Sequence, residues 1–283
     1  MTAFEDSMVS RLAAGAVIAV LLAANAHANP PGAVPLASHR AAYELSLADP
    51  ALPPPTSAQA PVAATGLIAY EFRGSACEGY SSSFRQMTEM DRNEGDPISM
   101  KVNATSFEDA DGKSMRFRVV SDGPQNAPAV AGVATREADD EMRVDLTKPA
   151  VKEIHFGHDV LFPTQHIERL IDAANKGVRV VEARVYDGSE TGAKIYSTMT
   201  IIGKEAKAGD DDNVASELEG ARRWPVVVSY FNEASKDTTP EYTLSFQLFE
   251  NGVSGSLKLD YGSFALNARL RKLEILPSSA CKK

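Results

Sequence analysis

The chain has 283 residues, and 29 Lys and Arg stand against 38 Asp and Glu, which gives a formal net charge of −9 at pH 7. This acidic balance opposes nonspecific binding to nucleic acid or to an anionic lipid surface. A chain of this length can bury a sizeable core, and all-β architectures often use such a length as one domain.

The N-terminal segment has the pattern of a secretory signal peptide. An uncharged apolar run, Leu12–Ala24, follows Arg11 and precedes the small-x-small triplet Ala26-His27-Ala28. The 13 residues of this run span only about 20 Å as a helix, too little for a bilayer core of about 30 Å. We therefore predict that residues 1–28 are a signal peptide cleaved after Ala28, and that the mature protein lies in the periplasm.

The first residues leave the start of translation open. Glu5 and Asp6 are unusual in a region that is normally positive, so translation starts at either Met1 or Met8. No cysteine lies at the cleavage site, and no later window reaches 18 consecutive apolar residues. We expect a soluble product with no lipid anchor and no stable membrane insertion.

Residues 29–283 are predicted to form a single domain. Residues 29–37 and 49–61 are rich in proline, which removes donors that strand pairing needs, so we expect a flexible leader and a long loop there. Residues 204–222 carry many charges and few large apolar side chains. We expect a second mobile loop in that segment, on the polar side of the fold.

Most of the mature chain alternates apolar and polar residues with a period of two, as strands with one buried face do. The pattern is clearest in Tyr242–Leu248, Leu257–Tyr261 and Phe264–Leu270. Asn251-Gly252 predicts a tight hairpin turn, and a one-residue shift before Leu273 predicts a β-bulge. Weaker alternation predicts further strands at Ala41–Leu47, Leu67–Phe72, Phe84–Met90, Ile98–Phe107, Met115–Val120, Val133–Arg136, Met142–Leu146, Val178–Tyr186, Ile195–Ile202 and Pro225–Phe231.

One segment predicts a helix. Thr164 is the expected N-cap, Gly177 the expected end, and the apolar stripe between them consists of Ile167, Leu170, Ile171 and Ala174. About fourteen strands at short spacing with one main helix predict a mainly β fold, a large curved antiparallel sheet or open barrel.

The two cysteines of the chain are Cys77 and Cys281. In an oxidising compartment, an exported protein with two cysteines usually joins them. A redox-active or metal-binding pair would favour a close C-x-x-C spacing, which is missing here. We therefore predict a structural disulfide between them.

Metal-binding candidates are few. His155 and His158 lie three residues apart beside Asp159, but that spacing in a strand does not put both rings on one face, and no second cluster completes the set. His166, in the predicted helix, is interpreted as a surface or packing residue. Asp210, Asp211 and Asp212 suggest calcium but lack EF-hand spacing, and a solvated charge run explains them better. We expect neither a metal nor a cofactor.

The sequence holds no convincing catalytic motif, so we expect no enzymatic activity. Gly252-Val253-Ser254-Gly255 misses the G-x-S-x-G spacing and the strand-to-helix context of a nucleophile elbow. Ser189 lies in the polar segment Asp187–Gly192, which hydrogen bonding within a turn explains. Phosphate loops and dinucleotide fingerprints are absent from the sequence.

Several short phrases together resemble the EipB-like family of α-proteobacterial envelope-integrity proteins, over about Ser38 to Cys281. Their order along the chain and the terminal cysteine make the set specific. The phrases are Tyr43-Glu44-Leu45, Cys77-Glu78-Gly79-Tyr80, Phe84-Arg85, Phe162-Pro163-Thr164-Gln165-His166, Val185-Tyr186-Asp187-Gly188-Ser189-Glu190, Trp224-Pro225, Ser229-Tyr230-Phe231, Asn251-Gly252-Val253 and Leu259-Asp260-Tyr261-Gly262.

The resemblance implies a periplasmic β-spiral of about fourteen strands, bent into an open half-barrel around a central helix and closed by a disulfide between Cys77 and Cys281. Similar architectures occur in periplasmic lipoprotein-handling and signal-sensing proteins. The family's role is envelope maintenance and resistance to envelope stress, with no established enzymatic activity, and a periplasmic tetratricopeptide-repeat protein is an implied partner. The segments Asp49–Pro61 and Asp210–Asp212 depart from the family pattern.

These observations favour a noncatalytic envelope protein that binds another protein or an apolar envelope component, such as a lipid. Apolar groups on the concave side of a bent sheet could line its site, although alternation alone does not say which face is concave. The alternative is a periplasmic hydrolase of cell-wall or lipid substrates, acting through residues such as His155, His158, His166 or Ser189. A purely structural scaffold with a filled interior is the third hypothesis.

Overall fold

The computed structural model describes residues 34–48, 61–123, 127–207 and 215–277. The predicted signal peptide and its cleavage site, most of the expected loop at 49–61, the acidic triplet Asp210–Asp212, and Cys281 lie outside these ranges. Within the described part of the chain, no helix has the length and apolar character needed to cross a bilayer.

Fifteen strands form one sheet in the described ranges, close to the number expected from the sequence. Its order is β8-β7-β6-β5-β4-β3-β2-β1-β15-β14-β13-β12-β11-β10-β9. The bounds are β1 His39–Leu47, β2 Pro61–Ser75, β3 Gly79–Arg92, β4 Ile98–Glu108, β5 Ser114–Asp122, β6 Val130–Arg136, β7 Met142–Lys148, β8 Lys152–His155, β9 Val160–Leu161, β10 Val180–Val185, β11 Tyr196–Ile202, β12 Arg223–Asn232, β13 Tyr242–Phe249, β14 Ser254–Asp260 and β15 Ala265–Ile275.

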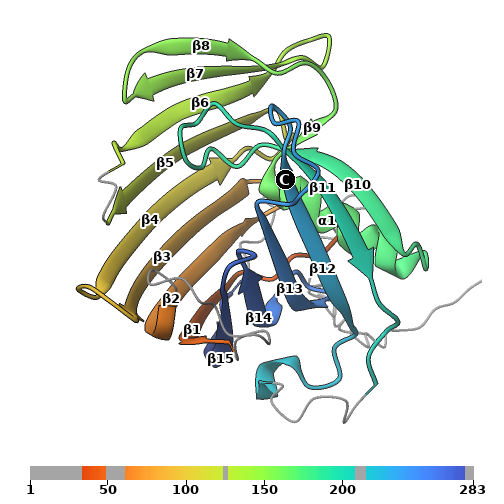
Figure 1. The fold of residues 1–283 in the computed structure, drawn as a ribbon. Coiled ribbons are helices and arrows are strands. Elements are labelled where there is room, and N and C mark those ends of the chain that lie inside the picture. The colour runs from red at the N-terminus through yellow and green to blue at the C-terminus, as the bar shows by residue number, and fades with distance from the viewer. Residues whose placement is uncertain (1–33, 49–60, 124–126, 208–214, 278–283) are drawn as a thin grey trace, which may run out of the picture.

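The sheet is long, curved and open, as the sequence predicted. Neighbouring strands are antiparallel except β9 and β10, which pair in parallel. β1 pairs with both β2 and β15, so the N-terminal and C-terminal strands meet in the middle of the sheet, and β8 and β9 are its two edges. The strands curl around helix α1 (Pro163–Asn175), which lies on the concave side (Figure 1).

Two local predictions near the C-terminus are confirmed. Ala42 pairs with Lys272 and Tyr43 with Leu270, so Arg271 is the extra residue of a bulge in β15. Gly252, with φ of 82°, lies in the turn between β13 and β14, where its N–H donates to the Phe249 carbonyl at 2.9 Å. A positive φ is accessible to glycine without strain, which explains this residue at the turn.

Helix α1 begins two residues earlier than predicted. Its N-cap is Phe162, whose backbone N–H donates to the Gln165 side chain at 3.0 Å. Thr164 is therefore not the cap: its hydroxyl instead donates to Glu108 on β4 at 2.9 Å. At the other end, Gly177 has φ of 73° and ends the helix as predicted. Its N–H donates a hydrogen bond to the Ala174 carbonyl at 3.0 Å.

Gln165→Ala is expected to destabilise the protein by about 1 kcal/mol, because it leaves the Phe162 N–H at the helix start without its acceptor. Urea unfolding measures this change. Lys176→Ala is the control on the same helix, since it removes only an exposed pair with Asp172 (2.6 Å) worth about 0.3 to 0.5 kcal/mol. An equal loss in both variants would contradict the assigned cap.

The concave side is packed by three apolar clusters. One joins strands β5–β7 to Phe162 and Tyr186, and a second packs Leu170 and Ile171 of α1 against Trp224 and its neighbours on β12. The third lies under β1, β2, β13 and β15. Burying this apolar surface on one face supplies the main driving force for curling the sheet around the helix.

Two segments that the sequence predicted to be a flexible leader and a mobile loop contribute side chains to these clusters. Val34 and Leu36, from the end of the expected leader 29–37, pack against the second cluster. Leu218, within the expected loop 204–222, is only 1% exposed and belongs to the third cluster. The expectation that residues 204–222 lie on the polar side of the fold is therefore wrong at Leu218, whose side chain packs into the core.

Candidate functional site

A row of aromatic side chains crosses three consecutive strands on the concave face and continues into the turn between β14 and β15. It starts at Tyr196 on β11, passes through Tyr230 on β12 and Tyr242 on β13, and ends with Tyr261 and Phe264 between β14 and β15. Tyr230 and Tyr242 are direct cross-strand partners with stacked rings 4.4 Å apart. Tyr196 meets both edge-on at 5.7 Å, Tyr261 lies 6.3 Å from Tyr242, and Phe264 lies 5.1 Å from Tyr261. We call these five residues the aromatic row.

The same strand alternation that builds the core places the row on the concave face. On β12, Tyr230 is in phase with the buried Val226 and Val228, and therefore points to the same side as they do. Exposure rises along the row from 2% at Tyr196 to 37% at Tyr261. The row therefore connects the packed interior with the surface.

Charged groups frame the buried end of the row. The Lys194 ammonium lies 5.0 Å from the centre of the Tyr196 ring and pairs with Glu190 and Glu241, at 2.7 Å each. The Tyr196 hydroxyl donates to Glu190 at 2.6 Å. Burial raises the pKa of the Asp187 carboxyl nearby. A cation over an aromatic face and these satisfied bonds hold this end in place.

Burial also raises the pKa of the tyrosine hydroxyls in the row, Tyr230 and Tyr242 included. These hydroxyls stay protonated at physiological pH, so each can donate or accept a hydrogen bond. The row offers flat apolar rings with polar tips, a surface suited to an amphipathic or apolar partner.

Strands β3 and β4 add half-buried apolar side chains to the same face. Met90, Ile98, Met100 and Val102 are in phase with the buried positions of their strands. None of the three core clusters formed by described residues includes them. The concave face is therefore filled by packed side chains around α1, and farther from the helix it carries apolar side chains that belong to no core cluster of described residues.

A buried carboxyl lies where β4 meets the helix. Glu108, 4% exposed, accepts hydrogen bonds from the Thr164 N–H at 3.1 Å and from the Thr164 hydroxyl at 2.9 Å. Desolvation raises the pKa of Glu108 to about 7, against the opposing effect of the Thr164 bonds. A small cavity of about 80 Å³ beside it is also lined by His39, Tyr70 and Phe72.

With the geometry established, comparison with known proteins assigns the family. The family model described as EipB-like matches residues 30–277, which is most of the chain. The chain belongs to the EipB-like family. The resemblance found in the short sequence phrases is thereby confirmed.

Two relatives place this EipB-like chain more closely. It is 34% identical over 273 residues to the cell envelope integrity protein EipB of Brucella abortus, covering 94% of both chains. It also matches the crystal structure of a β-barrel-like protein of a domain of unknown function from Brucella abortus, at 33% identity and a TM-score of 0.78. That match covers 87% of this chain and the whole of the other, which supports the open-barrel fold.

The structure of this EipB-like protein keeps the candidate histidines in different places. His155 on β8 is exposed and bonds Glu153 at 3.2 Å, which raises the pKa of its imidazole. His166 is buried on α1, 3.5 Å from the Thr198 hydroxyl, and desolvation lowers its pKa to about 4. His166 is thus buried in the packing of α1, the second of the two positions expected for it, and is not at the surface. In the described ranges, no group of three or more His, Cys, Asp or Glu is placed to hold a metal ion.

The serine candidates lie in ordinary structural contexts. The Ser189 N–H donates to the Asp187 carboxylate at 2.8 Å, the turn bonding that the sequence indicated. Ser254 opens strand β14, and its carbonyl accepts the Tyr43 hydroxyl at 2.8 Å. Neither serine lies at a strand-to-helix turn.

Sequence reasoning missed both the aromatic row and Glu108. Alternation placed Tyr242 and Tyr261 on strands but did not reveal that their rings meet. Glu108 had a signal, because it is in phase with the apolar positions Ile98, Met100 and Val102 of its strand. A carboxyl on an apolar face indicates a buried charge that needs a partner.

Proposed function

We propose that this EipB-like protein maintains the cell envelope without catalysis, by holding an apolar envelope component or an apolar protein segment against its concave face. The related Brucella abortus protein is named for cell envelope integrity. Export to the periplasm through cleavage after Ala28 is part of this proposal.

The single observation that carries the proposal is the aromatic row. Its rings form a continuous path from the core to a partly exposed end at Tyr261, and β3 and β4 add apolar side chains to the same face that no core cluster of described residues uses. Apolar surface left uncovered on a concave face favours a ligand that covers it. The charged groups around Lys194 fix the buried end, so a ligand meets a prearranged surface.

Tyr261→Ser is expected to weaken binding of the neutral fluorophore N-phenyl-1-naphthylamine by about tenfold, because it removes the exposed ring of the row, worth about 1.4 kcal/mol. Ile201→Ser on the outer face of β11 is the control, since Ile201 is also exposed but points away from the row. Fluorescence titration measures both. Unchanged binding in Tyr261→Ser, or equal losses in both variants, would contradict the site.

The hydrolase alternative requires its residues to share one cleft. The exposed contacts of His155 on β8 and the buried position of His166 on α1 support the noncatalytic reading instead. Single substitution of His155, His158, His166 and Ser189 with unchanged envelope function would leave that alternative without its residues. A protein partner, including one with tetratricopeptide repeats, stays a prediction that pull-down from the periplasm tests.

A further inference from the structure

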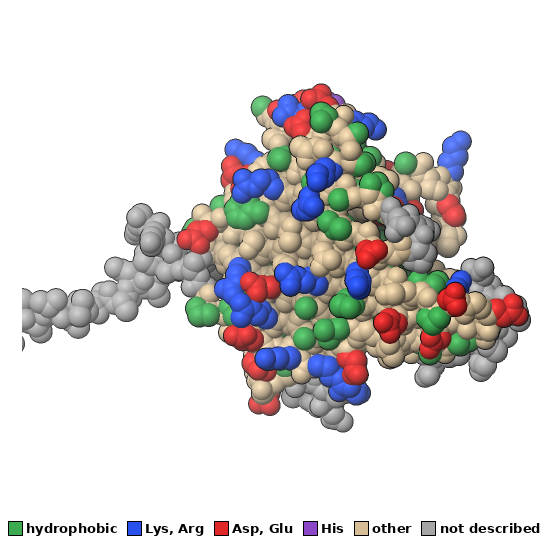
Figure 2. Space-filling view, turned by 90° about the vertical axis from the view of Figure 1, so that its left-hand side faces the viewer, with side chains coloured by type: hydrophobic (Ala, Val, Ile, Leu, Met, Phe, Trp, Pro, Cys, Tyr) green, Lys and Arg blue, Asp and Glu red, His purple; other side chains and the backbone are tan. Residues whose placement is uncertain are grey.

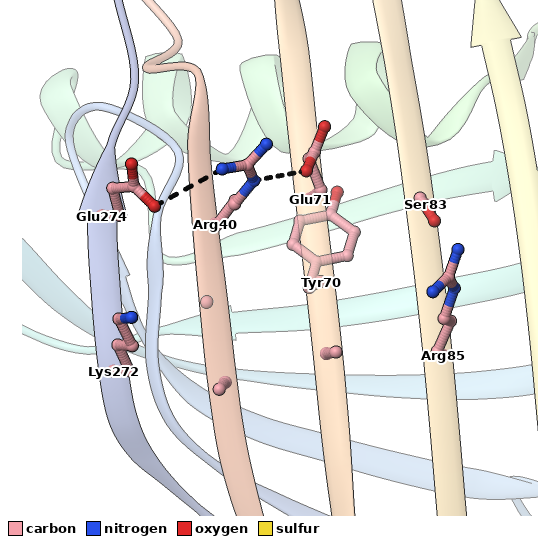
Figure 3. Close-up of a pocket in the computed structure, with 10 residues that line it drawn as sticks. Arg40, Tyr70, Glu71, Ser83, Arg85, Lys272 and Glu274 are labelled. Atoms are coloured by element: carbon pink, nitrogen blue, oxygen red, sulfur yellow. Dashed lines mark hydrogen bonds and ion pairs between the residues drawn. The ribbon is translucent and has the colours of Figure 1, made fainter.

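The convex face of the sheet carries a shallow hollow that the proposed function does not use. It has a volume of about 400 Å³ and spreads over β15, β1, β2 and β3. In Figure 3 the side chains of Arg40, Arg85 and Lys272 stand on the side of these strands facing the viewer, with α1 behind the sheet. The hollow therefore lies opposite the aromatic row.

Strand register explains why the face is hollowed at this point. Lys272 on β15 pairs with Ala42 on β1, Ala42 pairs with Ala69 on β2, and Ala69 pairs with Arg85 on β3. Two alanines side by side form a low floor, and a long cationic side chain rises at each end. The two end strands are about 14 Å apart, three strand spacings, so the two tips can converge on one group over the alanines.

The neighbouring row of charges is internally neutralised. Arg40 pairs with Glu71 at 2.5 Å and with Glu274 at 3.6 Å, and Glu71 also pairs with Arg73. The hydrogen bond from Arg40 lowers the pKa of the Glu71 carboxyl, which keeps it ionised. These two arginines and two glutamates leave no net charge at the rim.

Arg85 and Lys272 are the excess charges of the hollow. Within the described part of the chain, no carboxylate forms an ion pair with either of them. The guanidinium of Arg85 rises beside the hydroxyl of Ser83 (Figure 3). Two unpaired cations over a neutral floor provide the chemistry that binds an oxyanion such as phosphate.

Exposed apolar side chains lie directly beside these cations. Leu67, two residues before Ala69, pairs with Met87, two residues after Arg85, and they are 50% and 56% exposed. In Figure 2 the outer side of β2–β5 faces the viewer, and Lys and Arg side chains there are interspersed with apolar ones. Cations next to exposed apolar groups match an interface where phosphate groups lie above acyl chains.

We infer that this convex hollow binds the phosphate of an anionic lipid headgroup between Arg85 and Lys272, with Leu67 and Met87 contacting the lipid surface. The chain's net charge of −9 opposes such binding only at long range. At physiological salt the Debye length is about 8 Å, so the local pair of cations determines the interaction once the face touches the headgroups.

Co-sedimentation with vesicles of phosphatidylglycerol and phosphatidylcholine tests this inference. We expect the wild type to partition onto these vesicles and not onto pure phosphatidylcholine, and the double variant R85Q/K272Q to bind about thirtyfold less, since each basic side chain at an anionic surface contributes about 1 kcal/mol. The control K152Q/K236Q removes the same charge from exposed positions elsewhere and should bind like the wild type. Circular dichroism establishes that all variants are folded.

A second pair of substitutions, at the exposed apolar residues Leu67 and Met87, distinguishes a lipid from other sources of the anion. L67S/M87S should weaken vesicle binding but leave the binding of inorganic phosphate, measured by calorimetry, unchanged. Equal partition of R85Q/K272Q and wild type, or an equal loss in the control, would overturn the inference. Binding of inorganic phosphate or of polyglutamate without any vesicle binding would likewise overturn it, in favour of a free anion or an acidic protein.

Discussion

Cys77→Ser and Cys281→Ser are each expected to lower the midpoint of thermal unfolding and the steady-state level of the protein in the cell. The predicted bond closes a loop of roughly 200 residues, and the chain-entropy model assigns such a loop roughly 5 kcal/mol at most. That amount is comparable to the whole stability of many domains. The expected loss is therefore large.

Strand pairing brings Gly74 and Leu276, which lie shortly before Cys77 and Cys281 in the sequence, close to the same residue, Ser38. The Leu276 N–H, just after β15, donates to the Ser38 carbonyl at 2.8 Å, and the Ser38 hydroxyl accepts from the Gly74 N–H at 3.1 Å. Gly74 is three residues before Cys77, and Leu276 is five residues before Cys281. Five residues reach about 17 Å when extended, so the pairing needs no rearrangement of the sheet.

The single and double serine variants separate the bond from other effects of substitution. If the disulfide supplies the stability, Cys77→Ser, Cys281→Ser and the double variant lose the same amount, because either change breaks the bond completely. Peptide mapping without reductant identifies the linked pair directly. Equal melting temperatures with and without reductant, or two free thiols in the native protein, would refute the prediction.

Glu108→Gln is expected to remove a contribution of about 2.5 kcal/mol that the Glu108 carboxyl makes to stability at pH 5 and loses by pH 8. Burial raises the Glu108 pKa to about 7 in the folded state, from 4.5 in the unfolded chain. At this carboxyl the folded protein binds more protons than the unfolded chain does, so the stability that Glu108 contributes falls as pH rises through the folded pKa. Glutamine keeps an oxygen acceptor for Thr164 but cannot ionise.

Urea unfolding at pH 5 and pH 8 measures this effect. Relative to wild type, the free energy of unfolding of Glu108→Gln should be about 2.5 kcal/mol higher at pH 8 than at pH 5. The pH dependence that remains in the variant comes from other groups such as the buried His166, whose lowered pKa acts in the opposite direction. Glu89→Gln, on the exposed face of the adjacent strand β3, is the matched control and should leave the pH dependence of wild type unchanged. The same pH dependence in Glu108→Gln and wild type would show that the carboxyl is not the group responsible.

The link between Glu108 and Thr164 also matters for the concave face. It joins β4, which carries half-buried apolar side chains, to the first turn of the helix that fills the interior. Ionisation of this carboxyl is therefore expected to loosen the contact between the sheet and α1 rather than the strands themselves. Glu108→Gln changes this contact without changing any residue of the aromatic row, so its effect on stability can be measured apart from ligand binding.

Much of the fold was predictable from local pattern. The period of two in Tyr242–Leu248 and its neighbours, the turn at Asn251-Gly252 and the bulge before Leu273 all follow from side-chain geometry within a few residues. The end of the helix at Gly177 is also a local property, because glycine adopts the positive φ found there without strain. The start of the helix was predicted at the wrong residue, because the Thr164 hydroxyl bonds to Glu108, 56 residues away in sequence, instead of capping its own helix.

The sequence by itself determined the strand content, the single helix, the family and the expectation of a disulfide. Only the tertiary structure decided which face of each strand is concave, that Tyr230 and Tyr242 stack, and that Lys272 and Arg85 flank the same two alanines. Alternation defines two faces of a strand but does not say which one the curvature encloses. That choice depends on pairing between strands far apart in the chain, such as β1 with β15, and on the apolar surface that the helix buries.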